Sequence, residues 1–413
     1  MAADIHIKDL ANPVLTDEQK AIRAYGDTLK VDISRQSIMA EAEQIAGKND
    51  WGDLEFLERL DLICDEWSSD SNIKGIGHLS LRNKLLQHAT SRLLIQDQFN
   101  QHPEIHDIQI ERPIIVVGLP RSGTTHLLNL MAADTRLRSL PLWESYEPVP
   151  RPGESLLDTG RYQRCEDAWQ AMKASTPLIA AMHPMNPEHI HEELELMGPN
   201  FGSYNYEWLS YSPRWRDHYY AEDQTYQYEY MRDALKLLVW QQRDTDQPTR
   251  WVLKCPQHLE QLPILQTVFP DATIAITHRD PVAVIQSAIT IMAYGQRLSR
   301  DRVMTSELVE YWSDRVEHLL RACVRDRPLL APEQSIDVPF KTLIKDDVGM
   351  VEKIYQKAGL AMDDTAREAL TGFVEEHKED YGRVIYDLKG QFGVDPDDLR
   401  KRFDFYAKQY LTE

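Results

Sequence analysis

The sequence predicts an α/β fold, a parallel sheet flanked by helices on both faces, preceded by an all-helical segment. The first observation is the stretch RPIIVVGLPRSGTTHLLNLMAAD at residues 112–134, where a short β-branched run, a glycine-containing loop and a run with helical spacing follow one another. The second is that three more short apolar runs alternate with helical patterns later in the chain. Strands and helices alternating at these lengths are typical of a parallel sheet buried between two helical layers.

The first hundred residues carry helical patterns but no spacing that suggests chemistry. After a loose start at residues 1–15, apolar residues recur at helical intervals from Asp17 to about Asn100, and Asp53 is the expected N-cap of one of these helices. We therefore assign residues 1–105 to a helical segment that packs on the core or on a second subunit, so a homodimer is one arrangement to consider. Residues 106–413 form the expected α/β domain, with a helical and aromatic insertion at about 160–250.

The loop after the first strand is nearly a Walker A motif. Gly118, Gly123 and Thr125 fit the pattern G-x-x-x-x-G-K-[ST], but Thr124 stands where the lysine belongs. That lysine neutralises the β- and γ-phosphates of a nucleoside triphosphate, so its replacement argues against a Mg-triphosphate ligand. Arg121 returns a cation inside the loop, and the N–H groups of the helix start favour anions. The loop therefore predicts a site for a shorter anionic group; the alternative is a tight turn without a ligand.

The chain between the loop helix and the second strand is less regular. Leu140–Ser145 lies where the next strand or its exit loop is expected, and Pro187–Met197 has a helical pattern. The segment Met182–Tyr230 concentrates aromatic residues, which either line an apolar pocket or pack an irregular cap. Its three neighbouring histidines lack the H-E-x-x-H spacing and no cysteine is near, so no metal site is expected there. These histidines are His183, His189 and His191.

Two residues after the third strand form a second constellation. The later strands and helices are expected at Trp251–Lys254, Gln257–Phe269, Thr273–Thr277, Val282–Ala293, Ser335–Phe340, Val348–Lys357, Asp364–His377 and Pro396–Tyr406. Arg279 follows one strand end, and Ser287 lies eight positions later in a helix that Asp280 can cap. At the carboxyl edge of a parallel sheet both can converge beside the loop and clamp a phosphate. The alternative is that Arg279 pairs with a surface acid while Ser287 faces a neighbouring helix.

Together these motifs resemble those of sulfotransferases. The 5′-phosphosulfate loop of that family is similar to the run PRSGTT, which comprises Pro120, Arg121, Ser122, Gly123, Thr124 and Thr125. Arg279 with Ser287 is similar to the family's 3′-phosphate clamp, at the same spacing, and the resemblance spans roughly residues 110–405. It implies a P-loop NTPase-like sulfotransferase fold, 3′-phosphoadenosine 5′-phosphosulfate (PAPS) as co-substrate and no metal. The implied reaction is in-line transfer of a sulfuryl group to a hydroxyl of a small or lipid-like acceptor.

The resemblance also implies roles for cationic residues. Arg121 is expected to stabilise charge on the bridging oxygen, and Lys254 to reach the transferring sulfonate unless it forms a structural ion pair. Arginine at the loop position is similar to protein-tyrosine sulfotransferases, whereas cytosolic small-molecule enzymes usually have lysine, so the acceptor class stays open. Sulfotransferases cover the nucleotide with a late basic and glycine-containing segment, for which Gly382-Arg383 is the first option and Lys389-Gly390 the second.

A base should accept the proton of the acceptor hydroxyl. Glu144 is the leading candidate, because it follows the loop by about the interval of the catalytic glutamate in the tyrosine-modifying branch. The alternative is a carboxylate that caps a helix or forms a salt bridge. The rival bases are His191, Glu192 and Glu193, and His126 is less favoured because it lies one helical step beyond the loop.

The composition restricts the partners. The 46 Lys and Arg residues against 66 Asp and Glu residues give a net charge of −20, which opposes binding to nucleic acids and to anionic membranes. An anionic co-substrate therefore needs a local cationic pocket. The sequence starts without a signal-like apolar stretch, no run reaches transmembrane length, and the four cysteines are dispersed. We expect a cytoplasmic protein with reduced thiols and no integral membrane segment.

Two other functions are considered. The near-Walker loop is compatible with a Mg-dependent kinase or NTPase, which Thr124 opposes. The long helical N-terminus is compatible with a non-catalytic nucleotide-binding or scaffold protein, in which Glu144 and His191 would have no measurable role.

Overall fold

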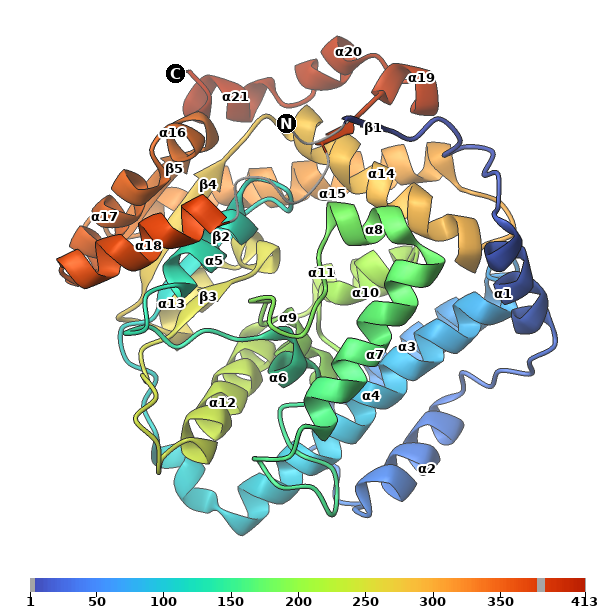
Figure 1. The fold of residues 1–413 in the computed structure, drawn as a ribbon, viewed down its shortest axis with the longest axis horizontal. Helices are drawn as coiled ribbons and strands as arrows, with labels where there is room; N and C mark the ends of the chain where they lie inside the picture. Colours follow the sequence, from blue (N-terminus) through green and yellow to red (C-terminus); the bar gives the residue numbers. More distant parts are fainter. Residues whose placement is uncertain (1–3, 377–382, 413) are drawn as a thin grey trace.

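A four-stranded parallel sheet forms the centre of the α/β part. The computed structural model describes residues 4–376 and 383–412. The strand order is β3-β2-β4-β5, and every pairing is parallel. The strands are β2 (Ile114–Gly118), β3 (Val252–Lys254), β4 (Thr273–His278) and β5 (Ser335–Pro339) (Figure 1). The predicted α/β class and its four strands are confirmed, because short β-branched runs between turn residues specify buried strands locally.

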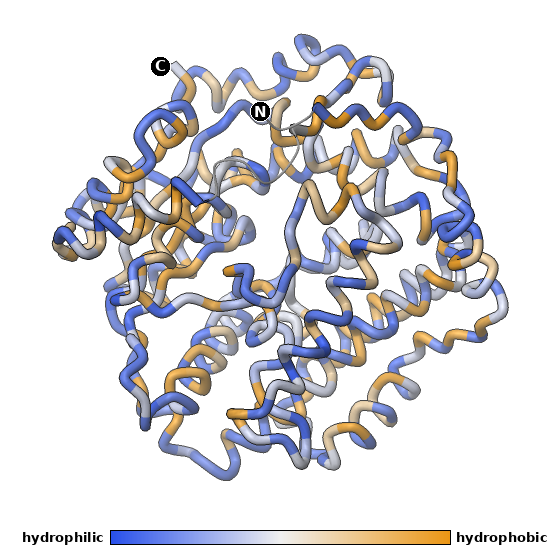
Figure 2. Tube along the Cα trace, viewed as in Figure 1, coloured by the Kyte–Doolittle hydropathy of each residue, from blue (hydrophilic) through white to orange (hydrophobic). Residues whose placement is uncertain are grey.

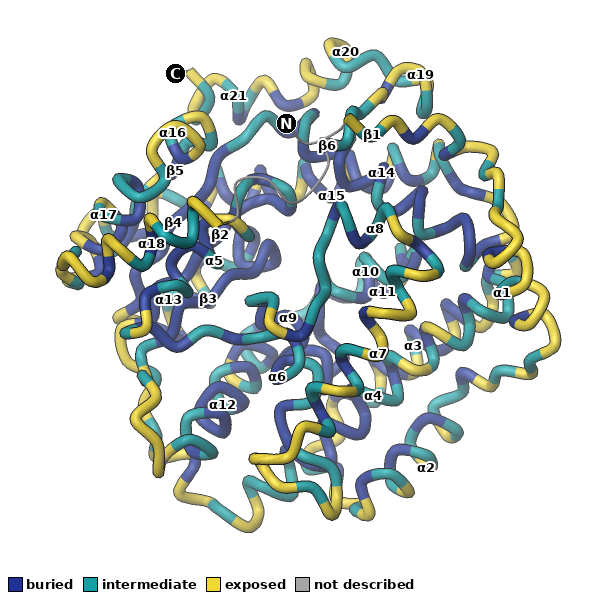
Figure 3. Tube along the Cα trace, in the orientation of Figure 1, coloured by how far each residue is buried: buried dark blue, intermediate teal, exposed yellow. Residues whose placement is uncertain are grey.

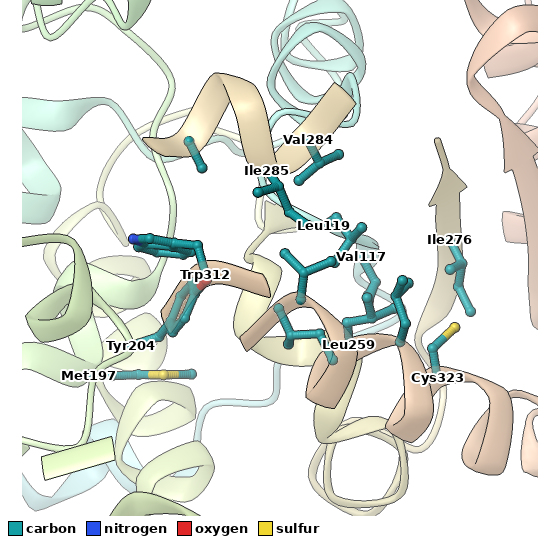
Figure 4. Packing of buried hydrophobic residues seen from close by; sticks show 14 of the residues in the cluster. Val117, Leu119, Met197, Tyr204, Leu259, Ile276, Val284, Ile285, Trp312 and Cys323 are labelled. Carbon is teal, nitrogen blue, oxygen red and sulfur yellow. The ribbon is translucent and has the colours of Figure 1, made fainter. Parts of the chain in front are cut away.

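The two faces of the sheet are covered by different helices. Ile115 and Val117 of β2 belong to a hydrophobic cluster with α14 (Pro281–Ser299) and α15 (Thr305–Asp326). Figure 4 shows Val117 and Leu119 packed among Ile285 of α14 and neighbouring apolar side chains. The alternate residues of β2 face a second cluster, which includes residues of α5 (Thr124–Ala132), α17 (Asp347–Ala358) and α18 (Asp364–Glu376). Because successive side chains point to opposite faces, both faces of β2 are buried (Figure 3).

The N-terminal helices share one hydrophobic cluster with helices from the middle of the chain. They are α2 (Arg35–Ala46), α3 (Phe56–Ser69) and α4 (Gly75–Gln101); α1 (Asp17–Asp27) precedes them and contributes no residue to the cluster. Their partners include α11 (Pro213–Ala221) and α12 (Thr225–Gln241). Figure 2 shows hydrophobic and hydrophilic residues alternating along these helices, as amphipathic packing requires. The division of the chain at residue 105 stays a prediction.

The remaining helices are short, except for α7 with its 16 residues. They are η1 (Pro103–Asp107), α6 (Leu142–Tyr146), α7 (Gly160–Ser175), α8 (Pro177–Met182), α9 (Leu194–Met197), η2 (Gly198–Asn200), α10 (Asn205–Leu209), η3 (Pro256–Glu260), α13 (Leu262–Val268), η4 (Arg327–Leu329), α16 (Phe340–Lys345), α19 (Leu388–Phe392), α20 (Pro396–Lys401) and α21 (Asp404–Tyr410). Within the described ranges, no helix has the length and apolar composition needed to cross a lipid bilayer.

The predicted helix at Pro187–Met197 is wrong over most of its length. Only Leu194–Met197 is an α-helix. The preceding residues pair with the chain around Leu140 instead: the N–H of His191 donates to the Leu140 carbonyl at 2.8 Å, and the N–H of Leu142 donates to the His189 carbonyl at 2.9 Å. Backbone groups used in this non-local pairing cannot form helical hydrogen bonds.

Other boundaries differ for local reasons. The helix predicted at Gln257–Phe269 is split into η3 and α13, with a proline in the first turn of α13. Helix α3 starts at Phe56 with Glu55 as N-cap, so Asp53 is not the cap, and its carboxylate accepts the N–H of Glu55 at 2.8 Å. Asp280 does cap α14, accepting the N–H of Val282 at 3.0 Å.

Residues 4–6 form a strand rather than the predicted loose start. Strand β1 (Asp4–His6) pairs in parallel with β6 (Arg383–Ile385), and Figure 3 shows the two side by side beside α14. The adjoining residues Ile7 and Leu10 are buried in the cluster that includes α14. A strand of three residues is too short to show a periodic sequence pattern, and its partner strand lies near the other end of the sequence, so neither could be recognised.

The close approach of β2 and β4 generates the first testable prediction. The register pairs Gly118 with Thr277, and a Cβ at position 118 would lie 2.0 Å from the Thr277 Oγ1 atom. We expect Gly118→Ala to lower the free energy of unfolding by about 1–3 kcal/mol, since packed strands cannot separate without strain. The matched control is Gly372→Ala in α18, where a Cβ meets no atom within 4 Å and should stabilise by up to about 1 kcal/mol. Urea unfolding of both variants measures the difference; equal stabilities would contradict the close approach.

Candidate functional site

The glycine loop is held by a buried hydroxyl pair at the carboxyl edge of the sheet. The Ser122 Oγ atom lies 2.5 Å from the Leu119 carbonyl and 2.7 Å from the Thr277 Oγ1 atom. Ser122 is fully buried, and Pro120 is buried beside it. Ser122 therefore fixes the shape of the loop. Thr277, the penultimate residue of β4, was not among the residues expected at the site. Because β2 and β4 are adjacent parallel strands that end at the same level, a residue near the end of β4 could have been expected beside the loop.

The loop ends in a helix start without a side-chain cap. Gly123 is the N-cap of α5 with a φ of +92°, and Arg121 also has a positive φ, +65°. Arginine rarely adopts this conformation, and such backbone is concentrated at functional sites. Because glycine has no side chain to accept from the first-turn N–H groups, the amides near Thr124 and Thr125 remain a place for an anion.

Arg279 and Ser287 both reach the loop. One guanidinium N–H of Arg279 donates to the Arg121 carbonyl, and the Arg279 guanidinium lies 4.1 Å from the centre of the Phe340 ring. The Arg121 Nε–H donates to the Ser287 Oγ atom at 3.1 Å, and its Nη2 donates to the Met182 carbonyl at 3.0 Å. The structure therefore brings together two stretches that are 158 positions apart.

Neither of these guanidinium groups is neutralised. Within residues 4–376 and 383–412, neither Arg121 nor Arg279 forms an ion pair with a carboxylate. Burial, together with the positive charge of Arg121, lowers the pKa of Arg279. By contrast, the buried Arg315 pairs with Glu207 and Glu260. Two adjacent, half-buried cations without a counter-charge, in a chain of net charge −20, predict an anionic ligand.

Lys254 supplies an amine beside the loop from a different strand. It ends β3 and is almost fully buried. Its Nζ atom lies 3.2 Å from the Thr125 Oγ1 atom and also forms an ion pair with Glu192. The cation that the loop lacks at position 124 is therefore provided by the neighbouring strand end.

The acidic candidates occupy different environments. Glu192 contacts Lys254 and so adjoins the loop. Glu193 is fully buried and bridges the Lys254 backbone N–H at 2.9 Å and the His258 Nε2 atom at 2.7 Å. Glu144 is 3% exposed and forms an ion pair with Arg138, whose guanidinium lies 4.8 Å from the centre of the Trp251 ring. Of these three carboxylates, that of Glu192 contacts the Lys254 amine, which in turn contacts Thr125 of the loop.

Three histidines form a cluster near Lys254. The ring centres of His183, His189 and His191 are 6.0–6.1 Å from one another. Burial, reinforced by the charges of Arg121 and Lys254, lowers the pKa of His183 to about 3, and burial with Lys254 lowers that of His189 to about 4. Burial also places the pKa of His191 well below its usual value. Across the described part of the chain, no group of His, Cys, Asp or Glu has the arrangement of a metal site.

The aromatic residues of Met182–Tyr230 mostly pack inside the protein. Six of them are no more than 2% exposed, namely Phe201, Tyr204, Tyr206, Trp215, Tyr219 and Tyr228. Of the two interpretations left open by the sequence, packing describes these six. Aromatic spacing alone does not show which way a ring points, so the sequence could not decide between the two. The segment reaches the loop at its start, where the Met182 carbonyl accepts a hydrogen bond from Arg121.

The remaining candidates lie at the edge of the site or outside it. His126 forms an ion pair with Asp347 at 3.0 Å, and Lys389 pairs with Asp395 at 3.2 Å. The backbone of Arg383 belongs to β6, while Gly382 and the Arg383 side chain lie outside the described residues. Tyr386, three positions after Arg383 in the same candidate segment, accepts a hydrogen bond from the Ser287 Oγ atom at 2.8 Å.

Comparisons with known proteins agree with this geometry. Residues 113–364 match the family model described as "Sulfotransferase family". The sulfotransferase STF1 from Mycobacterium tuberculosis H37Rv is similar over 91% of this chain and 100% of its own, with 27% identity and a TM-score of 0.78. The sulfotransferase STF9 from Mycobacterium avium has the same fold over 94% of this chain and 98% of its own, with 22% identity and a TM-score of 0.81. No curated protein sequence matches the chain. A match over more than half of its length shows that this chain is an enzyme of the sulfotransferase family.

Proposed function

We propose that this sulfotransferase moves a sulfuryl group from 3′-phosphoadenosine 5′-phosphosulfate to a hydroxyl of a small or lipid-like acceptor. The observation that carries the proposal is the pair of adjacent guanidinium groups, Arg121 and Arg279, which meet at the glycine loop without a carboxylate partner within the described ranges. A donor with negative charge at both ends of an adenosine supplies the missing counter-charge.

The residues of the site fit the two charged ends of this donor. The 5′-phosphosulfate is assigned to the uncapped start of α5, with Thr124, Thr125 and the amine of Lys254 beside it. The 3′-phosphate is assigned to Arg279 and Ser287, which are eight positions apart along the end of β4 and the following helix. Arg121 joins the two regions, because its backbone carbonyl contacts Arg279 and its side chain contacts Ser287.

The proposed step is an in-line displacement at sulfur. The acceptor oxygen forms a new bond to sulfur while the bond from sulfur to the 5′-phosphate oxygen breaks, and adenosine 3′,5′-bisphosphate leaves with that electron pair. Charge grows on the oxygen between sulfur and phosphorus, so fixed cations near it lower the barrier. Arg121 and Lys254 are the cations beside the loop.

Glu192 is assigned as the base that accepts the proton of the acceptor hydroxyl. Sequence alone favours Glu144, but the Glu144 carboxylate is held by Arg138, whereas Glu192 adjoins Lys254 and through it Thr125. A base must lie within hydrogen-bond reach of the reacting group, so position favours Glu192. His191 remains the alternative base, because its imidazole is neutral and belongs to the histidine cluster.

The acceptor is assigned to the side of His183, His189 and His191. Met182, which precedes this segment, accepts a hydrogen bond from Arg121 through its carbonyl, so the segment starts at the loop. Three neutral imidazoles can donate or accept hydrogen bonds without repelling a nearby cation. They favour an acceptor that presents polar groups around the reacting hydroxyl.

Loss of the Arg279 charge tests the donor assignment. We expect Arg279→Ala to weaken binding of adenosine 3′,5′-bisphosphate by roughly ten- to a hundredfold, the usual worth of a charge-assisted hydrogen bond. Titration calorimetry measures the affinity, with Arg243→Ala as a control because Arg243 lies over the Trp240 ring away from the loop. If the wild-type protein does not bind this nucleotide, or if Arg279→Ala binds it equally well, the donor assignment fails. Mg-ATP hydrolysis by the wild type would instead favour an NTPase.

The base assignment is tested by two matched substitutions. Glu192→Gln keeps the size and one acceptor oxygen but removes the basicity, so turnover should fall by about a hundredfold or more while nucleotide affinity changes little. Glu144→Gln should leave the transfer step nearly unchanged in the folded fraction. The assay follows labelled sulfuryl groups transferred to hydroxyl compounds, starting with a simple phenol and a long-chain alcohol. The opposite ranking of the two variants would return the role to Glu144.

The depressed pKa values of the histidines predict a pH dependence of stability. Unfolded imidazoles titrate near 6.5, whereas His183 and His189 titrate at about 3 and about 4 in the folded protein. The unfolded state therefore binds more protons between these values, and the free energy of unfolding must rise with pH across this window. We expect the His183→Asn, His189→Asn double variant to lose less stability between pH of about 6.5 and about 4.5 than the wild type.

Denaturant unfolding at several pH values measures this slope. His106→Asn is the control, because this partly exposed residue lies on η1 outside the cluster. An unchanged slope in the double variant would show that the two imidazoles are protonated normally in the folded protein.

A further inference from the structure

A tyrosine near the C-terminus belongs to the same hydrogen-bond chain as the candidate phosphate clamp. The Tyr386 hydroxyl accepts from the Ser287 Oγ atom at 2.8 Å, and Ser287 in turn accepts from the Arg121 Nε–H at 3.1 Å. Tyr386 also lies close enough to Arg279 for an electrostatic interaction with its guanidinium. Four side chains from separate parts of the sequence therefore meet at one point.

The phenolic proton of Tyr386 is not used in this arrangement. Since its oxygen accepts from Ser287, its own O–H remains a donor, and residues 4–376 and 383–412 provide no acceptor for it. A half-buried hydroxyl beside two guanidinium groups without counter-charges is suited to donate to an anion. A phosphate monoester has enough acceptor oxygens to take this donor together with the Arg279 guanidinium.

The N-terminal strand fixes the position of Tyr386. This residue follows β6 directly, and β6 is paired in register with β1, with Ile5 opposite Val384 and His6 opposite Ile385. Ile5 packs against the cluster that includes α14, the helix that carries Ser287.

Two more contacts secure the N-terminal segment on the protein. The Leu10 N–H donates to the Gln391 Oε1 atom at 3.2 Å, and Asp9 forms an ion pair with Arg297 of α14 at 3.1 Å. The residues that precede β6 are therefore not the only part of the chain that fixes the position of Tyr386. Its position depends on residues at the opposite end of the sequence.

We propose that Tyr386 is a binding residue for the 3′-phosphate of the nucleotide, and that strand β1 positions it against Ser287. This inference rests on the proposed donor. The hydroxyl donates to the 3′-phosphate only, so it selects nucleotides that carry this group. In this proposal strand β1 does not itself contact the nucleotide; it pairs with β6 and so fixes the position of Tyr386, which follows β6.

The direct test uses two nucleotides that differ only in the 3′-phosphate. Tyr386→Phe removes one oxygen atom and should weaken binding of adenosine 3′,5′-bisphosphate by roughly five- to tenfold. Binding of adenosine 5′-phosphate should be unchanged. Tyr226→Phe is the matched control, since it also removes a bonded tyrosine hydroxyl, but one that contacts Asp53. It should change neither affinity in titration calorimetry.

The role of β1 is tested by a double-mutant cycle. Ile5→Asp places a charge where Ile5 packs on the hydrophobic cluster and should release β1, with a loss of bisphosphate affinity similar to that of Tyr386→Phe. The combined variant should show no further loss, because both changes remove the same interaction. Multiplied losses in the combined variant, or an Ile5→Asp protein that keeps full affinity, would overturn the role of β1.

The outcomes separate this inference from the proposed function. A wild-type protein that binds neither nucleotide overturns both. A wild-type protein that prefers the bisphosphate, together with a Tyr386→Phe variant that keeps the same preference, overturns the inference alone. A loss for both nucleotides in Tyr386→Phe would also overturn it, because the hydroxyl would then not act through the 3′-phosphate.

Discussion

The site depends on the parallel pairing of β2 with β4. This pairing makes the carboxyl ends of the two strands level, with Gly118 opposite Thr277, and brings Arg279 to the loop although 158 positions separate it from Arg121. The approach is close because position 118 has no Cβ. It also allows the Thr277 hydroxyl to hold Ser122 and so the shape of the loop. Ligand sites at the carboxyl edge of parallel sheets follow from this geometry.

Two adjacent cations without a carboxylate partner among the described residues characterise the site. The buried Arg315 is neutralised by Glu207 and Glu260, because an isolated charge in the interior is costly. Arg92 and Arg161 are also buried, and their hydrogen bonds go to backbone carbonyls and to an amide oxygen. At the loop, Arg121 and Arg279 lack such partners within the described ranges, and the pKa of Arg279 is lowered by burial and by its neighbour. The free protein therefore holds unfavourable charge that a dianionic ligand would relieve.

The strands, the loop and the approach of Arg279 and Ser287 to the loop could be predicted from sequence because each is specified locally. A β-branched run between turn residues gives a strand, and the eight positions from Arg279 to Ser287 span a strand end and two helical turns. Non-local pairing could not be predicted: residues before Leu194 pair with the chain near Leu140, and β1 pairs with β6. The environment of Glu144 is also three-dimensional, since its partner Arg138 packs over a tryptophan more than a hundred positions away.

Arg121 connects the two sides of the proposed reaction, and this limits what its substitution can show. Its guanidinium donates to Ser287 of the proposed phosphate clamp and to the Met182 carbonyl at the start of the histidine segment, while its own carbonyl accepts a hydrogen bond from Arg279. A change at position 121 therefore disturbs donor binding, acceptor binding and loop conformation together. Arg279, Tyr386 and Glu192 each contact only one part of this arrangement, so their single substitutions separate steps that Arg121 combines.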